Sequence, residues 1–267
     1  MSAFRPVARR ELQAAPGANT SIEAPTYGRE LAQAYDAVMA EAAWPSLSRG
    51  LARALSRAPV AAAADIGCGS GRVLQWLAAR GHSPLFGVDR SAAMLHLSGR
   101  RLDRRRVRLM QQDIRALALP QPVELITCTF ATLNYLVDDA ALARALAAVA
   151  RNLRPGGLFV ADYIPWLDDQ APPSTHHQLV SARGRRSAWR TRLDPQRGLS
   201  ETRIAFQGGV VERHVQRHRR PAEMKAALAA AGLTPVSAFA LGPGGPSPWR
   251  MLVARRDAGR RGDVRHG

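Results

Sequence analysis

Apolar and polar positions alternate in two ways along the chain, and the difference predicts two kinds of sheet. From residue 59 to 163, short apolar runs bounded by glycine or aspartate are separated by segments with helical spacing of apolar residues, such as 72–80 and 138–153. Such runs are typical of buried parallel strands. Strands are predicted to end at Asp65, Asp89 and Cys128, with others near residues 111 and 163. Alternating strands and helices predict a parallel sheet with helices on both faces.

Residues 165 to 219 follow the second pattern, in which apolar and polar residues alternate one by one. Four such stretches, separated by turn sequences at 194–198 and 207–209, predict an antiparallel sheet of three or four strands. Open α/β sheets bind ligands at the carboxyl ends of their strands, so we expect this insertion to lie across that edge. A helix over 221–231 then ends at Gly232, and two further strands are predicted before residue 257.

A glycine motif, Asp65-Ile-Gly-Cys-Gly-Ser-Gly71, joins the first predicted strand to its helix. Gly67, Gly69 and Gly71 let the backbone turn sharply and pass close to a ligand. The pattern differs from the dinucleotide fingerprint G-x-G-x-x-G, because Arg72 occupies the place of the third glycine. A lone glycine motif is weakly specific, so nicotinamide dinucleotide binding remains an alternative at this point.

Further motifs follow the glycine motif in order. Asp89 ends the second strand in the sequence VDR, where a carboxylate can accept hydrogen bonds from ribose hydroxyls. The sequence QQDI places Asp113 after the third strand, and LRPGG precedes the fifth. In this combination and order, the motifs resemble those of the class I S-adenosylmethionine-dependent methyltransferases, over about residues 27–165 and 221–256.

This resemblance implies an α/β fold with a Rossmann-like, mostly parallel sheet of seven strands whose last strand is antiparallel. Helices cover both faces, and the small antiparallel β insertion lies over the active site. The implied cofactor is S-adenosylmethionine. Its methionine portion would contact Asp65, Gly67, Gly69 and Gly71, its ribose Asp89, its adenine Asp113 and the Ile114 backbone, and its methionyl group Phe130.

A narrower resemblance concerns the methyl acceptor. The sequence Glu212-Arg-His-Val-Gln-Arg217, followed by a helix ending in Ala-Ala-Gly-Leu, is similar to sugar-amine and other small-molecule N-methyltransferases. It implies methyl transfer to an amine or hydroxyl of a small molecule by in-line displacement, with residues 165–219 as a lid. The Tyr35-Asp36 pair resembles one in the cap helix of such enzymes, although a plain surface helix would show the same apolar spacing.

Candidate catalytic residues follow from the chemistry. An in-line attack on a sulfonium methyl group needs mainly alignment and exclusion of water, and a hydroxyl acceptor also benefits from a general base. Imidazole titrates near neutral pH, which makes His214 the leading candidate base. It alternates with Glu212 and Gln216, so the three share one face of a predicted strand, unless that face is merely solvated.

Aromatic and amide side chains near the strand ends complete the predicted site. Asn134 and Tyr135 follow the fourth strand and are expected beside the transferred methyl group, as catalytic residues that orient the nucleophile. The predicted acceptor-binding residues are Tyr27, Tyr35, Tyr163 and Trp166. No metal is expected, because the spacing of the histidines matches no standard site.

Composition limits the choice of partner. The net charge of +17 suggests nucleic acid, but Lys225 is the single lysine among 38 basic residues, which favours codon bias in a GC-rich genome. The densest cluster, 100–108, lies between a predicted helix and strand and is typical of a solvated face. TFATLN after the fourth strand also lacks the Asn- or Asp-Pro-Pro-aromatic sequence common in methyltransferases of nucleic-acid base amines. A small-molecule acceptor is therefore expected; an RNA methyltransferase and a non-catalytic cofactor-binding protein are the alternatives.

Length and targeting signals predict one methyltransferase domain over residues 21–256. No run of 18 apolar residues occurs, and the first twenty residues lack the apolar core of a secretion signal, so we expect a cytoplasmic protein without a membrane span. Cys68 and Cys128 are predicted to be buried thiols. Residues 1–20 and 257–267 are expected to be disordered, and a homodimer is left open.

Overall fold

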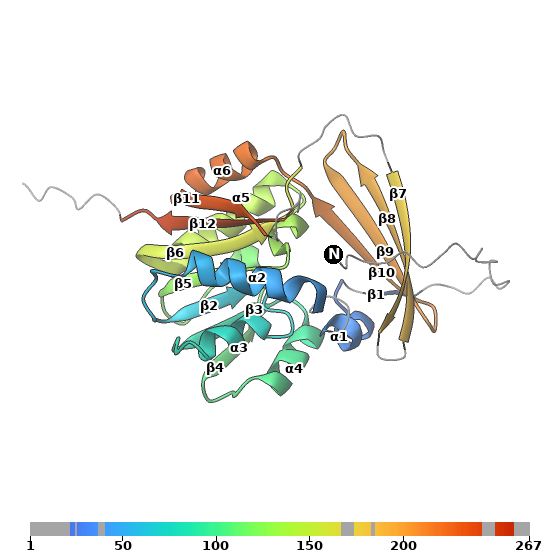
Figure 1. The fold of residues 1–267 in the computed structure, drawn as a ribbon, viewed down its shortest axis with the longest axis horizontal. Coiled ribbons are helices and arrows are strands. Elements are labelled where there is room, and N and C mark those ends of the chain that lie inside the picture. Colours follow the sequence, from blue (N-terminus) through green and yellow to red (C-terminus); the bar gives the residue numbers. More distant parts are fainter. Residues whose placement is uncertain are drawn as a thin grey trace, which may run out of the picture.

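A computed structural model describes residues 22–24, 26–36, 41–166, 174–182, 185–241 and 249–258 (Figure 1). The segments predicted to be disordered, residues 1–20 and all but the first two of residues 257–267, lie outside the described residues.

The main sheet has seven strands in the order β11-β12-β6-β5-β2-β3-β4. Neighbours from β6 through β4 pair in parallel, whereas β12 runs antiparallel to both β6 and β11, so the predicted mostly parallel sheet with an antiparallel strand is confirmed. The strands are β2 (Ala63–Ile66), β3 (Leu85–Asp89), β4 (Val107–Gln111), β5 (Val123–Cys128), β6 (Leu153–Tyr163), β11 (Leu233–Ala240) and β12 (Arg250–Arg256).

Helices cover both faces of this sheet, and their starts are set by polar caps. Ser91 and Asp138 each accept a hydrogen bond from a backbone N–H in the first turn of the following helix, which satisfies a donor that the helix cannot pair itself. The helices are α2 (Glu41–Ala54), α3 (Arg72–Ala78), α4 (Ala92–Arg101), α5 (Asp139–Asn152) and α6 (Pro221–Ala230).

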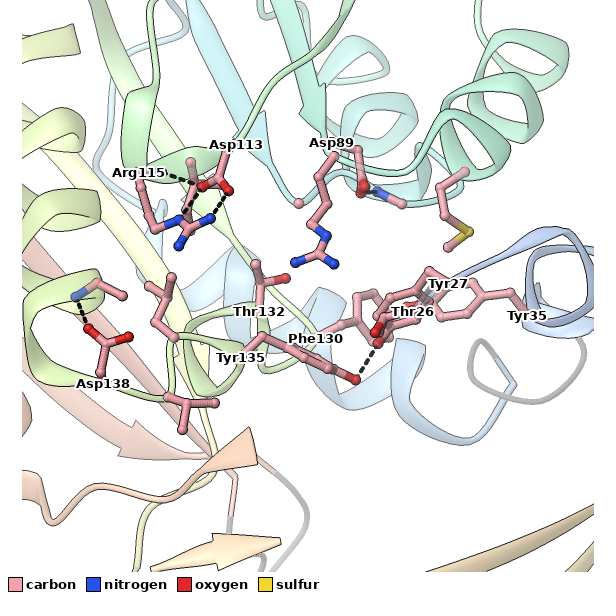
Figure 2. A pocket seen from close by; sticks show the side chains of 18 residues that line it. Thr26, Tyr27, Tyr35, Asp89, Asp113, Arg115, Phe130, Thr132, Tyr135 and Asp138 are labelled. Carbon is pink, nitrogen blue, oxygen red and sulfur yellow. Dashed lines mark hydrogen bonds and ion pairs between the residues drawn. The ribbon is translucent and has the colours of Figure 1, made fainter. Parts of the chain in front are cut away.

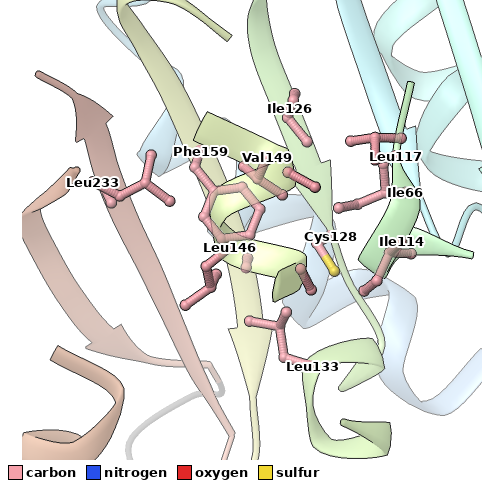
Figure 3. Packing of buried hydrophobic residues seen from close by; sticks show 14 of the residues in the cluster. Ile66, Ile114, Leu117, Ile126, Cys128, Leu133, Leu146, Val149, Phe159 and Leu233 are labelled. Carbon is pink, nitrogen blue, oxygen red and sulfur yellow. The ribbon is translucent and has the colours of Figure 1, made fainter. Parts of the chain in front are cut away.

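Two large apolar clusters form most of the core, one on each face of the main sheet. On one face, Leu146 and Val149 of α5 pack against Phe159 of β6 and Ile126 of β5 (Figure 3). On the other, side chains of α2 and α3, including Leu51 and Leu74, are fully buried against the sheet. Burial of both faces explains why the parallel strands have continuous apolar runs in the sequence.

The inserted sheet has the order β1-β10-β9-β8-β7 and stands beside the edge at which β6 ends (Figure 1). The four antiparallel strands confirm the predicted insertion, and they are β7 (Ser174–Ala182), β8 (Arg185–Asp194), β9 (Leu199–Phe206) and β10 (Val210–Arg217). The fifth strand, β1 (Ile22–Ala24), pairs in parallel with β10 and was not predicted, because three residues are too few to show alternation. A short helix, α1 (Arg29–Tyr35), follows β1 and lies between the two sheets.

Candidate active site

Two adjoining cavities lie where the main sheet faces the inserted sheet. The larger has a volume of about 330 Å³ and the smaller about 140 Å³. Four aromatic side chains line both cavities and so form the boundary between them, and these are Tyr27, Tyr35, Phe130 and Tyr135. Figure 2 shows these four side chains together in the lining of the larger cavity.

The larger cavity gathers most of the residues predicted to bind the cofactor. Its lining includes Gly67, Gly69, Asp89, Asp113, Ile114 and Phe130. Several other lining residues were not predicted, among them Arg90, Met94, Arg115, Thr132 and the segment 136–138. The sequence carries no common motif for these residues, because they come from different helices and loops that folding brings together. A small hollow beside Gly67, Gly69 and Arg72 continues the cavity under Phe130.

Asp89 is fixed at one side of the larger cavity. Its carboxylate accepts hydrogen bonds from the backbone N–H groups of Gly69, at 2.9 Å, and Ser91, at 2.8 Å. Burial raises the pKa of this carboxyl, while the two hydrogen bonds partly offset that rise. Two carboxylate oxygens offer about four acceptor positions, so Asp89 retains capacity for ligand hydroxyls.

Asp113 stands at the other end of the cavity and is paired with Arg115. The guanidinium of Arg115 contacts both carboxylate oxygens, with distances of 2.9 and 2.5 Å (Figure 2). Hydrogen bonding to Arg115 lowers the pKa of Asp113, so this carboxylate remains ionised at neutral pH. An ionised acceptor at this position suits an exocyclic amino group.

The glycine loop leaves room for a ligand because of its backbone. Gly67 has φ of +68°, and a Cβ at this position would lie 2.6 Å from the side chain of Thr132, which lines the cavity. Any larger residue would fill the cradle and strain the backbone. These features, with the carboxylates of Asp89 and Asp113, fit the predicted S-adenosylmethionine.

Two predicted cofactor contacts lie behind the cavity lining instead of in it. Asp65 is buried under the loop and accepts a hydrogen bond from the hydroxyl of Thr127 at 2.6 Å; burial raises its pKa to about 7. Gly71 begins α3 with φ of +80°, and a Cβ there would collide with Ser98. Neither residue lines a described cavity, so their contact with the methionine portion of the cofactor stays a prediction.

A hydrogen-bonded chain crosses the aromatic boundary into the smaller cavity. The hydroxyls of Tyr27 and Tyr135 are 3.0 Å apart, and the hydroxyl of Tyr135 is 3.0 Å from Nδ1 of His214. Nε2 of His214 is 3.2 Å from Oε2 of Glu212. The predicted shared face of His214, Glu212 and Gln216 is confirmed, since Gln216 lines the smaller cavity beside His214.

Burial keeps the two phenols of this hydrogen-bonded network protonated and holds Glu212 among backbone donors. Glu212 is fully buried, and its carboxylate also accepts the backbone N–H groups of Tyr27, at 2.8 Å, and Gly28, at 3.1 Å. Burial raises the pKa of Tyr27 to about 12 and that of Tyr135 well above its usual value, so both phenols are protonated at neutral pH. We assign Nε2 of His214 as the donor to Glu212 and Nδ1 as the acceptor of the Tyr135 hydroxyl, because this assignment satisfies both hydrogen bonds of the imidazole.

The rest of the smaller cavity is mainly apolar. Its other lining residues are Leu31, Ala131, Ile164, Trp189, Thr202, Ile204 and Trp249. The predicted wall of Tyr163 and Trp166 is not found: the Tyr163 side chain is buried in the core, and Trp166 packs near His218. Ile164, which lies between them on the chain, faces the cavity instead, because side chains point in alternate directions as the backbone leaves the strand.

Asn134 also differs from its predicted catalytic role. Its amide donates to the carbonyls of Ile164, at 2.9 Å, and Arg217, at 2.8 Å, and accepts from the N–H of Ile164 at 3.0 Å. Ile164 directly follows β6 of the main sheet, and Arg217 is the last residue of β10 in the inserted sheet. The side chain is buried with its hydrogen bonds satisfied, so Asn134 joins the two connections instead of orienting a nucleophile.

Two further predictions concern the cysteine side chains and a membrane span. Cys68 and Cys128 are free, buried thiols whose pKa values are raised by burial. Among the described residues, no helix is both long and apolar enough to cross a membrane.

Comparison with known proteins supports the same interpretation. Residues 63–157 match the family model of a methyltransferase domain. A dTDP-4-amino-2,3,4,6-tetradeoxy-D-glucose N,N-dimethyltransferase from Saccharopolyspora spinosa is 36% identical over 104 residues, which are 38% of this chain and 39% of that enzyme. The matched part thus spans about two fifths of that curated relative.

Two of the similar solved structures each match more than four fifths of the chain. An amino pentose methyltransferase from Micromonospora echinaspora, involved in calicheamicin biosynthesis and solved with S-adenosylmethionine bound, has a TM-score of 0.65 and 27% identity; the match covers 83% of this chain and 96% of that one. An S-adenosylmethionine-dependent methyltransferase from Clostridium acetobutylicum has a TM-score of 0.72 and 19% identity, with 85% and 98% covered. The second likeness concerns the fold alone.

The strand order, the glycine loop and the paired acids of the larger cavity define a methyltransferase fold of the Rossmann-like class. Residues 63–157 form a methyltransferase domain, and the rest of the chain resembles small-molecule methyltransferases that use S-adenosylmethionine, which supports S-adenosylmethionine as the cofactor.

Proposed function

We propose that this protein methylates the amine of a small, largely apolar amino sugar. The observation that carries the proposal is the hydrogen-bonded chain of Tyr27, Tyr135, His214 and Glu212, which starts at the boundary of the two cavities and ends at a buried carboxylate. An amino group is largely protonated at neutral pH and must lose a proton before it attacks, and these side chains give it a place to deliver that proton. The cofactor, when bound, supplies an electrophilic methyl group on a sulfonium.

The direction of the chain suits removal of a proton from the acceptor. Tyr135 donates to Nδ1 of His214, so Tyr27 donates to Tyr135 and its own phenolic oxygen remains free to accept. An amine N–H bound to this oxygen passes its proton along the two phenols to His214, where the imidazolium forms beside the carboxylate of Glu212. The neutral phenols act as relays, and His214 acts as the base.

The lining of the smaller cavity limits the acceptor. Its described residues include no Asp, Glu, Lys or Arg, and Trp189 and Trp249 offer flat aromatic surfaces. A volume of about 140 Å³ holds about one six-membered ring. A deoxy sugar presents an apolar face to such walls and its amine to the polar side. The relative from Saccharopolyspora spinosa is named for a sugar of this kind.

The inserted sheet then serves as the lid of the acceptor site, with residues 165–219 as its extent. Its inner face supplies Trp189, Thr202, Ile204 and His214 to the cavity. Its outer face carries Arg190, Arg203 and Arg213, which lie opposite one another across the strands and are exposed. This basic row is on the side away from the cavities, which disfavours the alternative of an RNA acceptor guided to the site by charge.

The test is a transfer assay with matched acceptors. The protein is incubated with S-adenosylmethionine and a nucleotide-linked 4-amino deoxy sugar, the same sugar with a 4-hydroxyl, or RNA, and S-adenosylhomocysteine release is measured. We expect turnover with the amine at least 100-fold above that with the hydroxyl. Equal turnover of both sugars would contradict an amine acceptor. Turnover with RNA alone would favour the RNA methyltransferase, and cofactor binding without transfer to any acceptor would favour a non-catalytic role.

A further inference from the structure

Three non-glycine residues have a left-handed backbone within the described part of the chain. They are Tyr27, Phe130 and Ala131, with φ values of 57°, 57° and 54°. This conformation is strained for residues with a Cβ and persists only where the surroundings hold it. All three residues line the smaller cavity, and two of them belong to the aromatic boundary. Backbone strain is thus concentrated where the two ligands meet.

A buried carboxylate holds each strained segment. Glu212 accepts the backbone N–H groups of Tyr27 and Gly28, as described above. On the opposite wall, Oδ1 of Asp162 accepts the backbone N–H of Ala131 at 2.6 Å. Asp162 is fully buried at the end of β6, and its Oδ2 has no hydrogen-bond partner among the described residues. The carboxylate is therefore committed to the backbone of the Phe130–Ala131 turn.

The Phe130–Ala131 turn places the Phe130 side chain in the wall that three spaces share. Phe130 lines the larger cavity, the smaller cavity and the hollow beside the glycine loop. Its ring packs edge-on against Tyr35, with centroids 6.3 Å apart. If the turn relaxed toward negative φ, this side chain would leave the wall that all three spaces share.

We propose that Asp162 is a positioning residue for methyl transfer: by accepting the N–H of Ala131, it holds the left-handed Phe130–Ala131 turn and so sets the wall between cofactor and acceptor. Asp162 lies behind this wall and lines none of the described cavities. Its role in the reaction rests on the proposed function, whereas its effect on the cofactor site does not.

The hydrogen bond, and not the charge, is the active feature of Asp162. Burial raises the pKa of this carboxyl to about 7, so the charged and neutral forms coexist near neutral pH. Both forms present an oxygen that accepts the N–H of Ala131. An amide at position 162 would accept the same hydrogen bond but carries no charge. Asp162→Asn therefore distinguishes a role as hydrogen-bond acceptor from a role as negative charge near the sulfonium.

The experiment measures S-adenosylmethionine and S-adenosylhomocysteine binding by calorimetry, without any acceptor, for wild type, Asp162→Ala, Asp162→Asn, Ala131→Gly and the double variant Asp162→Ala/Ala131→Gly. We expect Asp162→Ala to raise Kd about tenfold and Asp162→Asn to stay within threefold of wild type. The double variant should return to within threefold of Ala131→Gly, because glycine adopts positive φ without strain and needs no tether.

A double variant that binds as weakly as Asp162→Ala would overturn the proposal, since the defect would then come from the space left in the core. Asp162→Asn binding as weakly as Asp162→Ala would also overturn it, in favour of a counter-charge. Asp162→Leu, which fills the same space without an acceptor atom, replaces Asp162→Ala if the latter does not fold. Should the amino-sugar acceptor prove wrong, wild type itself would fail the transfer assay, while these cofactor affinities would still decide the role of Asp162.

Discussion

The main sheet and the inserted sheet both contribute buried polar groups to the site, but they hold them in different ways. In the main sheet, Asp89 and Asp162 stand at strand ends and are held by backbone N–H groups of adjacent loops. In the inserted sheet, Glu212 and His214 lie in the middle of β10, where Glu212 bonds to the N-terminal segment and His214 to Tyr135. We call the larger cavity with its lining the cofactor half of the site and the smaller cavity with its lining the acceptor half. The geometry of the cofactor half thus depends on local loops, whereas that of the acceptor half depends on the packing of distant segments.

The largest expected effect concerns the acceptor half. His214→Ala removes the base, and we expect kcat to fall about 10²-fold while the Kd for S-adenosylmethionine changes less than threefold. The measurement is steady-state turnover of the amine acceptor across pH 6 to 9, together with calorimetry. His177→Ala, at an exposed position of β7, is the matched control and should leave both values unchanged. Unchanged turnover of His214→Ala across this range would show that His214 is no base.

A comparable effect is expected in the cofactor half. Asp89→Ala removes the predicted ribose contacts and the anchor of Gly69, and we expect S-adenosylmethionine affinity to fall about 50-fold, roughly 2 kcal/mol. Titration calorimetry measures this directly, and Asp103→Ala, at an exposed loop position, serves as the control. If NADH bound wild type and S-adenosylmethionine did not, the assignment of the glycine loop would be wrong.

Trp189→Ala should affect acceptor binding without affecting cofactor binding. The side chain lines only the smaller cavity, so we expect the acceptor KM to rise about tenfold, roughly 1.4 kcal/mol, with kcat and cofactor affinity within twofold of wild type. Trp76→Ala, which removes a tryptophan stacked on Arg80, provides the control. A fall in kcat without a change in KM would place Trp189 in the chemical step instead.

The buried acids of the main sheet predict a pH-dependent stability. The folded-state pKa of Asp65 is about 7, above its value of about 4 in an unfolded chain, so the folded protein binds the extra proton between these values. Stability should therefore fall as pH rises toward 7, by up to about 1.4 kcal/mol per pH unit for this group, and level off above. Asp65→Asn should reduce the slope of the unfolding free energy between pH 5 and 7, whereas Asp103→Asn should not. An unchanged slope would mean that Asp65 is ionised throughout.

The smallest effect is expected on the outer face of the inserted sheet. Glu201 accepts hydrogen bonds from Arg203 and Arg213, which lowers its pKa to about 2, but the arginines are largely exposed. Exposed ion pairs stabilise little, so Glu201→Ala should change the free energy of unfolding by less than about 1 kcal/mol and leave turnover unchanged. Denaturant titration checks this, and a loss above about 2 kcal/mol would show that the outer face stabilises the inserted sheet.

The sequence by itself determined the main sheet and placed six of the predicted cofactor-binding residues in the lining of one cavity. Continuous apolar runs, the glycine loop and single acids at strand ends are local signals, and Asp89 and Asp113 lie where those signals put them. The alternation in β10 likewise indicated that Glu212 and His214 share a face.

Only the tertiary structure decided how the acceptor side is built. The hydrogen bonds that link Tyr27 to Glu212 join segments 185 residues apart in the sequence. Trp189 and Trp249 line one cavity, although the sequence gives them no common motif. Asn134 and Trp166 looked like site residues but bond to backbone groups or pack elsewhere, because the connections of the inserted sheet pass beside them. Hydrogen bonds and cavity walls between distant segments depend on packing, and no local pattern of residues records that packing.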